Sequence, residues 1–525
     1  MPEYLTPGVY VEEIERGPRP IEGVPTSTAA FLGLTERGPL RPRFLTSYGQ
    51  YARWFGNVFS PTQFMPHAVS GFFENGGKRL YVSRIVGAQS GTATAPVGGF
   101  TAEAVGPGAW GNNVWFRVLA SSTRNADNTP AGFQLRLAYW STRPQAPFDP
   151  FEPTNQNLRP WPQLTEVYDN LSVNPELPDY FSKRLTDTAT NLSVSSLMGL
   201  RLTDPNTPAA LPAPTAGDFL ANGVDGTLPL TDADFEGIPD AQIGRPRQGL
   251  SQLELDPFRD VALVYAPFPA DDPQNTIAKS IVTHCESQRF RFAVIDSPNV
   301  DPINLFPRNQ QTGITDTQYA AFYAPWIVIS DPQTGARVTV PAGGHMLGIY
   351  ARSDTERGVF KAPANEIVRG ALDVAFDVND ATQGELNPRG VNAIRAFPAR
   401  GIRIWGARTL SSNGLWKYVS VRRLFIFLER SIYEGTQWVV FEPNDDRLWA
   451  RVKDTIRLFL RSQWRAGALF GRTEDEAFFI TCDRSTMTQD DILNGRLICE
   501  IGIAPVRPAE FVIFRVFQHT AESQR

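Results

Sequence analysis

Histidine is the side chain most often used as a general base, and it is also a frequent metal ligand. The sequence has four histidines: His67, His284, His345 and His519. None of them belongs to an H-E-x-x-H zinc pattern, and no G-x-S-x-G nucleophile motif occurs. His284 is followed directly by Cys285, but neighbouring side chains on a helix point about 100° apart. The histidines therefore predict neither a catalytic dyad nor a metal site.

Asp296 and His345 come closest to a subtilisin-like catalytic triad. Asp296 ends an apolar, strand-like run, and His345 follows two glycines at the start of a helix-like run. A triad also needs a nucleophilic serine beside the histidine. Downstream of His345, no serine stands between glycines at the start of a helix, and Ser353 falls inside the helix-like run itself. The sequence therefore predicts no catalytic residue, and we expect the protein not to be an enzyme.

Two further segments resemble ligand-binding loops only in part. Residues 71–78 have the glycine separation of a phosphate loop, but Gly77 occupies the lysine position and Lys78 the Ser/Thr position. We predict a tight turn there instead. Residues 232–237 resemble the start of a calcium loop, but its twelfth position is Ile243, where a bidentate glutamate is needed. Neither segment predicts a bound metal or cofactor.

Length and composition favour a folded protein with more than one domain. The chain has 525 residues, of which 42% are hydrophobic and 20% are charged, and its formal net charge is -5. Single hydrophobic cores usually stop growing at about 250–300 residues. No block of lysine and arginine has the density of a nucleic-acid-binding tail, and no apolar run is long enough to cross a bilayer. We expect neither nucleic acid binding nor direct membrane insertion.

The cysteines indicate a reducing compartment. Cys285, Cys482 and Cys499 are odd in number and widely spaced, which fits neither a disulfide framework nor a zinc pattern. The N-terminal residues include several glutamates and have no apolar core of signal-peptide length. We expect the protein to be synthesised and assembled in the cytoplasm of the producing cell.

Two stretches of the chain alternate between strand-like and helix-like segments, which is typical of α/β proteins. The first stretch has strands at 29–34 and 79–86 and helices at 47–56 and 67–74. The second has strands at 261–268, 291–298 and 326–332 and a helix at 276–288. We predict that residues 26–90 and 253–385 form one central open α/β domain.

The remaining chain divides into an insert and a C-terminal domain. Residues 91–252 are rich in proline, threonine, asparagine and glycine and are weakly periodic, which predicts a loop-rich inserted β domain. Residues 386–525 are strongly patterned and are predicted to form a C-terminal α+β domain. This domain includes a mostly buried helix at 421–432. The overall class is therefore a mixed α/β (α+β) multi-domain protein.

A short β-favouring run near the N-terminus cannot bury a core by itself. It consists of Val9, Tyr10 and Val11, and it lies between Pro7-Gly8 and a segment rich in glycine and proline at 17–25. Two interpretations stay open. Residues 1–25 are either a frayed terminus or an extended arm that adds a strand to the sheet of another chain.

The C-terminal segment is strand-like and apolar on both faces. Phe511 and Ile513 face one side, and Val512 and Phe514 face the other. The segment could be a strand of its own domain's sheet. Alternatively it is an exposed strand that would promote aggregation unless a partner covers or extends its edge.

A second C-terminal helix, from Asn444 to about Gly467, is amphipathic, with Asn444 as the predicted N-cap. At about 100° per residue, its apolar residues share one face. These are Leu448, Trp449, Val452, Ile456, Phe459, Leu460 and Trp464. The opposite face carries Arg447, Arg451, Arg457, Arg461 and Arg465, interrupted by Asp454 and Leu458. This arginine stripe is either a solvated charged face or a docking surface for an acidic partner.

Several segments resemble the contractile tail sheath family. The first part of the chain contains YLTPGVYVEEI (4–14), TSTAAFLGLTERGP (26–39), FFENGGKRLYVSRI (72–85), ANGVDGT (221–227) and DADFEG (232–237). The densest similarity lies in GVNAIRAFPARGIRIWGARTLS (390–411), VRRLFIFLERSI (421–432), WVVFEPNDDRLW (438–449) and APVRPAEFVIFRVFQ (504–518). Residues from about 90 to 215 show no such similarity.

The resemblance implies a structural sheath subunit of a phage tail or of a phage-tail-like contractile injection system. Such subunits form stacked rings, expected to be six-fold, that wind helically around an inner tube and contract to drive the tube through a target envelope. The implied partners are other copies of the chain, the inner tube protein, and baseplate and terminal cap proteins. No cofactor is implied, and the resemblance leaves two alternatives open for the particle: release from the cell or anchoring to a membrane.

The resemblance also implies that both chain ends cross to neighbouring subunits and complete a shared sheet. Val9 to Val11 would be the N-terminal donor strand and Phe511 to Val516 the C-terminal one, within a donor segment that begins at about residue 505. The central domain would be a subtilisin-like open sheet without its active site, and residues 386–525 would be the sheath core domain. The arginine stripe becomes the candidate tube-facing surface.

Two other classes of function stay open. A serine-hydrolase-like enzyme on a subtilisin-like sheet would need a spatial triad around Asp296 and His345. A monomeric surface-binding module would explain the loop-rich insert and would remain a monomer in solution.

Overall fold

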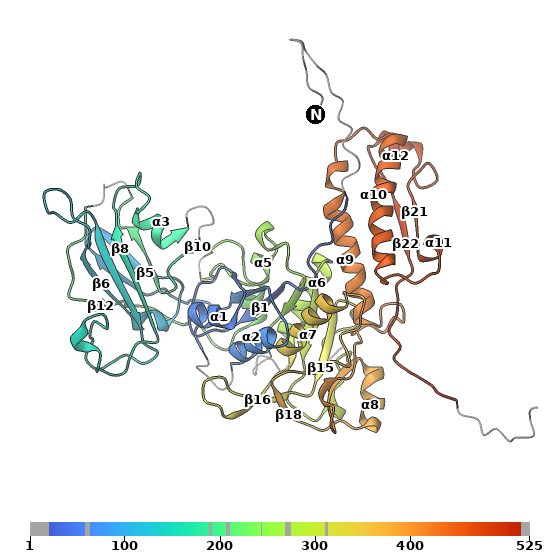
Figure 1. Ribbon diagram of the computed structural model, residues 1–525, viewed down its shortest axis with the longest axis horizontal. Coiled ribbons are helices and arrows are strands. Elements are labelled where there is room, and N and C mark those ends of the chain that lie inside the picture. Colours follow the sequence, from blue (N-terminus) through green and yellow to red (C-terminus); the bar gives the residue numbers. More distant parts are fainter. Residues whose placement is uncertain are drawn as a thin grey trace, which may run out of the picture. The chain divides into compact units, whose positions relative to one another are not determined.

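The structure is a computed structural model that describes residues 20–57, 63–187, 192–205, 210–242, 244–267, 275–309 and 313–515. The chain divides into two compact units (Figure 1). The larger unit comprises residues 25–357 and 361–422. The smaller unit comprises residues 423 onward, the short segment 358–360 and the residues up to 24.

The larger unit contains an eight-stranded sheet with the order β2-β3-β1-β13-β14-β15-β19-β20. Its strands are β1 (Ala29–Gly33), β2 (Arg43–Leu45), β3 (Leu80–Arg84), β13 (Leu263–Tyr265), β14 (Phe292–Asp296), β15 (Ala320–Ala324), β19 (Val391–Phe397) and β20 (Gly401–Ile404). The strands from β3 to β19 pair in parallel, whereas β2 and β20 pair antiparallel at the edges. Every residue of β1, β14 and β15 is buried, as expected for parallel strands covered on both faces.

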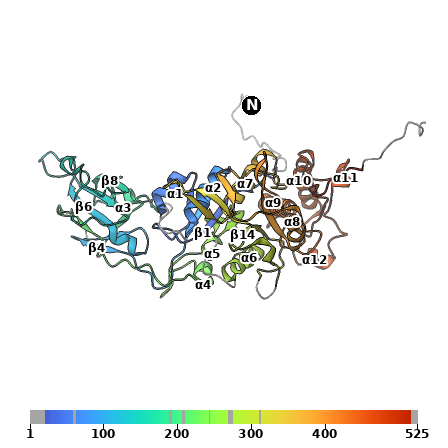
Figure 2. The same cartoon turned by 90° about the horizontal axis from the view of Figure 1, so that it is seen from below.

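Helices cover both faces of this sheet. They are α1 (Tyr48–Phe55), α2 (Met65–Glu74), α6 (Thr276–Gln288), α7 (Gly343–Glu356) and α8 (Asp380–Leu386). On one face, Ile281 of α6 shares a core cluster with Ala30 and Ile295 of the sheet. On the other face, Phe31 contacts Phe72 of α2, with 5.4 Å between ring centroids. Figure 2 shows α2 and α7 on one side of β1 and β14 and α6 on the other.

Most predicted elements of the α/β stretches are present, with two differences in pairing. The 326–332 run forms β16 (Ile327–Ser330), which belongs to a separate three-stranded sheet with β17 (Arg337–Val340) and β18 (Ala371–Val374). The C-terminal domain was expected to begin at about residue 386, but β19 and β20 are strands of the large sheet and the smaller unit takes up the chain at Arg423.

The described part of the predicted insert, residues 91–252, contains two larger antiparallel sheets, with the orders β12-β6-β7-β8 and β11-β5-β4, and a short antiparallel pair between 186–187 and 192–193. Its strands are β4 (Thr94–Val97), β5 (Phe100–Ala104), β6 (Val114–Ala120), β7 (Phe133–Tyr139), β8 (Leu164–Leu171), β11 (Met198–Leu202) and β12 (Asp218–Phe219). Alternating residues of both sheets, such as Phe100, Leu135 and Met198, share one core cluster. This arrangement is typical of sheets packed face to face.

The larger unit also contains several short elements. They are α3 (Phe181–Leu185), β9 (Thr186–Asp187), β10 (Leu192–Ser193), α4 (Asp232–Glu236) and α5 (Leu250–Leu253). Single-turn 3-10 helices lie at Ala109–Asn113, Pro153–Asn155, Asp256–Phe258, Pro302–Asn304, Asn387–Arg389 and, in the smaller unit, Gln437–Val439.

The smaller unit combines helices with a two-stranded antiparallel sheet. It contains α9 (Val419–Gly435) from Arg423 onward, α10 (Asp446–Arg465), α11 (Glu474–Ala477), β21 (Phe478–Thr481), α12 (Gln489–Leu493) and β22 (Glu500–Ile503). Leu428 of α9, Ile456 of α10 and Phe478 of β21 belong to one core cluster. The predicted buried helix at 421–432 is therefore part of α9. Among the helices that the structure describes, none has the length and apolar character needed to cross a membrane.

Candidate assembly interface

The C-terminal segment exposes an unusual run of large apolar side chains. After β22, Phe470 N–H donates to Ala504 O at 2.8 Å and Val506 N–H donates to Ala468 O at 3.2 Å. From residue 507 to residue 515 the chain forms no helix or strand, and Figure 1 draws this segment as an extended trace. Residues 511 to 514 expose 72%, 67%, 79% and 86% of their surfaces. Four consecutive exposed apolar residues indicate a binding segment, because soluble chains rarely present such a run to water.

The β21–β22 pair has open edges that could receive further strands. Ala504 N–H donates to Ala477 O, and hydrogen-bonded pairs alternate with non-hydrogen-bonded pairs along an antiparallel ladder. Ile480 and Ile501, which are paired in register, therefore form a non-hydrogen-bonded pair and direct their N–H and C=O groups to the two outer edges. No third strand joins this sheet in the described part of the chain. An isolated two-stranded sheet is only marginally stable in water.

The two faces of this sheet differ. Phe478, Ile480 and Ile501 contribute to the core cluster with α10. On the opposite face, Phe479 is exposed and its ring covers Gly502, where an added Cβ would lie 2.0 Å from a ring carbon. One face of the sheet is therefore already packed. On the outer face, and along the edges, the described residues add no further strand.

Helix α10 has the predicted apolar face but begins one residue later than predicted. Its N-cap is Asp445, whose side chain accepts from Leu448 N–H at 2.8 Å. Asn444 was predicted to be the cap, but its side chain instead accepts from Trp449 Nε1 at 2.7 Å and donates to Arg496 O. Apart from Trp464, which is half-buried, all the predicted apolar residues are buried.

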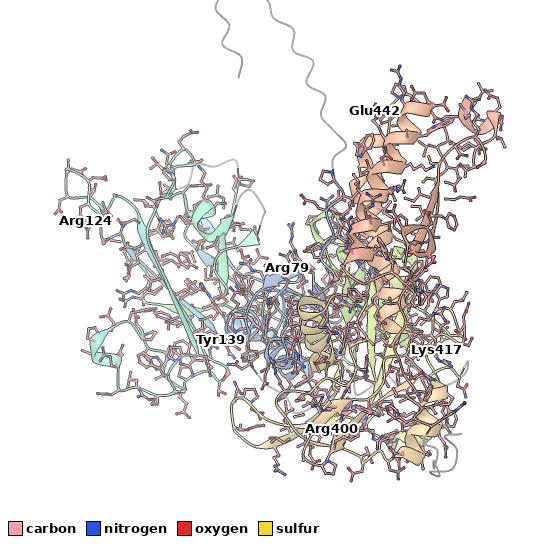
Figure 3. The ribbon with its side chains drawn as sticks, turned by 45° about the vertical axis from the view of Figure 1, so that its right-hand side comes forward. Arg79, Arg124, Tyr139, Arg400, Lys417 and Glu442 are labelled. Carbon is pink, nitrogen blue, oxygen red and sulfur yellow. The ribbon has the colours of Figure 1, made fainter. Side chains whose placement is uncertain are left out.

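The arginine stripe is partly neutralised within the smaller unit. Arg451 forms an ion pair with Glu442, with 3.2 Å between the charged atoms. Figure 3 labels Glu442 near one end of the long helices of the smaller unit. Arg457 and Arg461 both pair with Glu474. Arg447 and Arg465 are exposed, and no ion pair of either is found among the residues that the structure describes. The free positive charge therefore lies toward the two ends of the helix.

Glu474 is held by two arginines one helical turn apart. Its Oε2 accepts from Arg461 Nε at 2.6 Å, and its Oε1 accepts from Arg457. The hydrogen bond from Arg461, reinforced by Arg457, holds the pKa of Glu474 below its usual value. The sequence analysis did not identify this residue, because its partners lie 13 and 17 positions away in the chain.

Asp296 and His345, the two candidate triad residues, make hydrogen bonds and packing contacts within the larger unit. The Asp296 carboxylate accepts from Tyr265 OH at 2.6 Å and from Gly343 N–H, at the start of α7, at 2.7 Å. His345 is buried on α7 and packs closely against Gly71. A Cβ atom added to Gly71 would lie only 2.3 Å from the imidazole ring. Burial lowers the pKa of His345 to about 4, so the imidazole is neutral at pH 7. Ser353 is also buried, further along the same helix.

His284 and Cys285 also belong to the interior. His284 lies 2.6 Å from Arg291 Nη1, and burial, together with that guanidinium, lowers the pKa of His284 to about 3. Cys285 is fully buried beneath the large sheet, in the cluster that contains Ile281. Cys285 therefore packs between α6 and the sheet, whereas His284 contacts the Arg291 guanidinium.

The two ligand-like segments are local backbone structures. Residues 75–76 form a turn before β3, as predicted, and Gly76 has a φ of 112°. The 232–237 segment forms α4, where Asp234 accepts from Thr231 N–H at 2.9 Å in a capping box. No group of acidic, histidine or cysteine side chains among the described residues could hold a metal ion.

Several predicted residues lie outside the described residues. They are Val9, Tyr10 and Val11 of the N-terminal arm, Val516 of the C-terminal segment, and His519. The exchange of strands between subunits therefore stays a prediction.

Two family models match this chain. "Phage tail sheath protein central domain" matches residues 249–410, and "Phage tail sheath C-terminal domain" matches residues 411–519. A protein of Pseudomonas aeruginosa (strain UCBPP-PA14) named as a prophage major tail sheath protein is 25% identical over 252 residues, which cover 47% of this chain and 63% of that protein. The tail sheath protein of Salmonella phage ViI is 24% identical over 197 residues, which cover 37% of this chain and 30% of that protein. The chain thus spans less than two thirds of these relatives.

Solved sheath structures share the fold. The sheath complex of an extracellular contractile injection system in its contracted state has a TM-score of 0.58 and 23% identity, covering 99% of both chains. The contracted helical sheath of the anti-feeding prophage has a TM-score of 0.56 and 23% identity, covering 98% of this chain and 100% of that one. The mixed α/β, multi-sheet architecture is therefore that of these sheath proteins.

Proposed function

Because this chain belongs to the phage tail sheath family, whose two domain models together match just over half of it, we propose that it is a sheath subunit. In this proposal, copies of the chain polymerise helically around an inner tube and contract to drive the tube through a target envelope. This proposal rests mainly on two features of the smaller unit: the exposed apolar segment 511–514, and a two-stranded sheet that no further strand joins among the described residues. In this proposal, each subunit would supply both a strand that it donates and a sheet that receives strands.

Strand exchange would satisfy both features at once. Phe511 to Val516 would add to a β21–β22 sheet of one neighbour, and Val9 to Val11 would add to that of another. A donated strand has apolar side chains on both faces, so it suits a position between a packed core and an assembly contact. β-Augmentation also supplies the missing partners of the edge N–H and C=O groups.

Each donated strand is weak alone and strong in a lattice. About four added hydrogen bonds contribute roughly 0.5–1.5 kcal/mol each, and each buried apolar side chain contributes about 1.5–3 kcal/mol. Ordering the backbone costs about 1–2 kcal/mol per residue, which offsets most of this gain. In a ring, several arms hold each subunit simultaneously, so detachment of one arm is followed by rebinding. The arms can therefore act as hinges while the bodies rotate.

Contraction would be driven by larger and better-matched contacts between bodies in the short state. The two solved sheaths named above, which share this fold, are both contracted. We further propose stacked, six-fold rings, with baseplate and terminal cap proteins bound at the ends. Assembly would take place in the cytoplasm of the producing cell, as part of a phage tail or tail-like particle.

The tube-facing surface in this proposal is the arginine stripe of α10. Arg447 and Arg465 are the main candidates, because Arg451, Arg457 and Arg461 already pair with acids of their own unit. An acidic tube surface would complement them. Salt should weaken this contact, because exposed charges are screened.

The domain division remains part of the proposal. Residues 1–25 would be the exchange arm, and residues 26–90 with 253–385 would form a subtilisin-like sheet without an active site. Residues 91–252 would be an inserted domain, which the separate core of its two sheets supports. The C-terminal sheath core would be the predicted segment 386–525 without β19 and β20, which belong to the large sheet.

Deletion of residues 1–15 tests the proposed function. We expect the truncated chain to be soluble and folded but unable to form tubes, as judged by electron microscopy and by light scattering beside the full chain. A full-length protein that stays monomeric under all conditions would favour a surface-binding module. Normal tubes from the truncated chain would overturn the arm assignment.

A further inference from the structure

Cys482 and Cys499 face each other across the β21–β22 pair. The ladder extends to Thr481 opposite Glu500, so the next residue on each side places the two cysteines opposite one another. Each cysteine lies two residues from Ile480 or Ile501 along its strand direction. Because the two kinds of pair alternate along the ladder, Cys482 and Cys499 also form a non-hydrogen-bonded pair. In such pairs the Cα atoms are about 4.5 Å apart. Disulfides span Cα separations of about 4.4–6.8 Å, so the backbone is already suited to the bond.

The two thiols also share one environment. Both belong to the core-facing side of the sheet, where Cys482 is 4% exposed and Cys499 is half-buried. A hydrogen bond from the Cys499 thiol lowers the pKa of Cys482, and the same bond raises the pKa of Cys499. The positive charge of Lys453 on α10 also favours the Cys482 thiolate. The pair is therefore both close and activated, and the partial exposure of Cys499 gives a reagent access.

We propose that Cys482 and Cys499 are the site of a reversible disulfide, which forms when the folded protein meets a small-molecule disulfide. One thiolate attacks a sulfur of the reagent, forms a mixed disulfide and releases one thiolate leaving group. The second cysteine then loses its proton and attacks the protein sulfur of the mixed disulfide, releasing the second leaving group. Two protein thiols are oxidised, and one reagent disulfide is reduced to two thiols.

The bond would fasten the proposed acceptor sheet without closing it. It joins the ends of β21 and β22 and encloses residues 483–498, which include α12. The outer edges carry the backbone groups of Ile480 and Ile501, which the bond does not touch. A cross-link across a two-stranded sheet restricts its opening and its register. The oxidised sheet would therefore be a more rigid acceptor with the same open edges.

Thiol counting on the purified full-length chain tests this inference. The protein is treated with oxidised glutathione, denatured and assayed for free thiols, intact mass and non-reducing peptide composition. We expect two of the three cysteines to be lost, a mass lower by two hydrogens, and a peptide that joins Cys482 to Cys499. Dithiothreitol should restore all the thiols. Hydrogen exchange of the β21–β22 amides should slow in the oxidised protein.

Matched variants separate the pair from the third cysteine. C285S, which removes the thiol beneath the large sheet, should still form the internal bond, whereas C482S and C499S should not. Three free thiols in treated wild-type protein would overturn the inference. So would a stable glutathione adduct, or a joined peptide that arises only between two chains. These wild-type measurements decide the matter even where a variant fails to fold, and their outcome does not depend on tube formation.

Discussion

Glu474 ties α11 to α10 by accepting hydrogen bonds from two arginines of the longer helix. Replacing it with glutamine keeps the shape of the side chain but removes the charge that both guanidinium groups face. We expect Glu474→Gln to lower the free energy of unfolding of the smaller unit by about 1 kcal/mol at pH 7, since the pairs are partly exposed. Thermal unfolding of the purified variant beside the wild type measures the difference.

The same residue should make stability depend on pH in a defined direction. Its pKa is lowered in the folded protein, mainly by the hydrogen bond from Arg461. The stabilisation is therefore complete above the unfolded pKa of about 4.3, and it is lost as pH falls through the lower folded pKa. The gap between wild type and Glu474→Gln should be widest at neutral pH and should close in acid. The neighbouring Asp475→Asn, for which the structure gives no ion pair among its described residues, is the control. A gap that stays constant down to pH 3 would contradict this assignment.

Individual side-chain roles were only partly predictable. Asn444 and Asp445 are adjacent, and both are good N-cap residues, so sequence alone cannot choose between them. Burial of Trp449 decides the choice, because its indole N–H needs an acceptor and Asn444 supplies it. The partners of Glu474 and the facing of Cys482 and Cys499 depend on how distant segments pair, which no local pattern records.

The C-terminal segment should depend on its backbone as well as its side chains. Val512→Pro removes one backbone donor while leaving an apolar residue, so it should block strand addition at that position. The variant should unfold like the wild type, because the residue is exposed in the single chain. Tube formation, followed by sedimentation and electron microscopy, should be lost or reduced at least tenfold in rate.

A matched control for this variant lies in the same segment. Val512→Thr keeps the backbone donor and the β-branched shape, so tubes should still form. If Val512→Pro assembles as readily as Val512→Thr, residues 511–516 do not form an added strand.

The arginines of α10 should separate into two classes. Arg447→Gln with Arg465→Gln should leave folding unchanged and should weaken co-assembly with the inner tube of the same particle, most clearly at low salt. Arg457→Gln with Arg461→Gln, the matched pair, should chiefly lower thermal stability, because both partners of Glu474 are removed. Tube binding in a pelleting assay at two salt concentrations measures the first effect. Equal losses of tube binding in both double variants would contradict the division.

Elements were predicted well where their patterns are local. Buried parallel strands are apolar on both faces, so β1, β3, β13 and β14 appear in the sequence as continuous runs. The order of the strands within a sheet could not be predicted in this way, because it depends on pairing between distant segments of the chain. The extension of the large sheet by β19 and β20, and the separate sheet of β16, could not be derived from apolar runs. The insert's two sheets were also missed individually, because short strands between proline-rich loops give weak periodicity.

At the scale of the whole molecule, two features of the chain suggest a need for neighbouring copies. The large sheet of the larger unit is covered by helices on both faces. The smaller unit instead contains the exposed apolar residues 511–514 and a two-stranded sheet that no further strand joins among the described residues. A sheath needs this combination, because its subunits must keep their neighbours while their bodies change contacts. In the proposed sheath, cooperative contraction would follow from many weak links per subunit, and the loss of one type of arm should abolish the lattice as a whole.

The path of residues 507–525 in assembled tubes is the most direct test of this account. A cryo-electron microscopy reconstruction of tubes formed by the full-length chain would reveal it. We expect Phe511 to Val516 to be hydrogen bonded along an edge of a β21–β22 sheet that belongs to another copy. If the segment instead folds onto the sheet of its own chain, with no strand passing between subunits, the proposed mechanism of assembly is wrong.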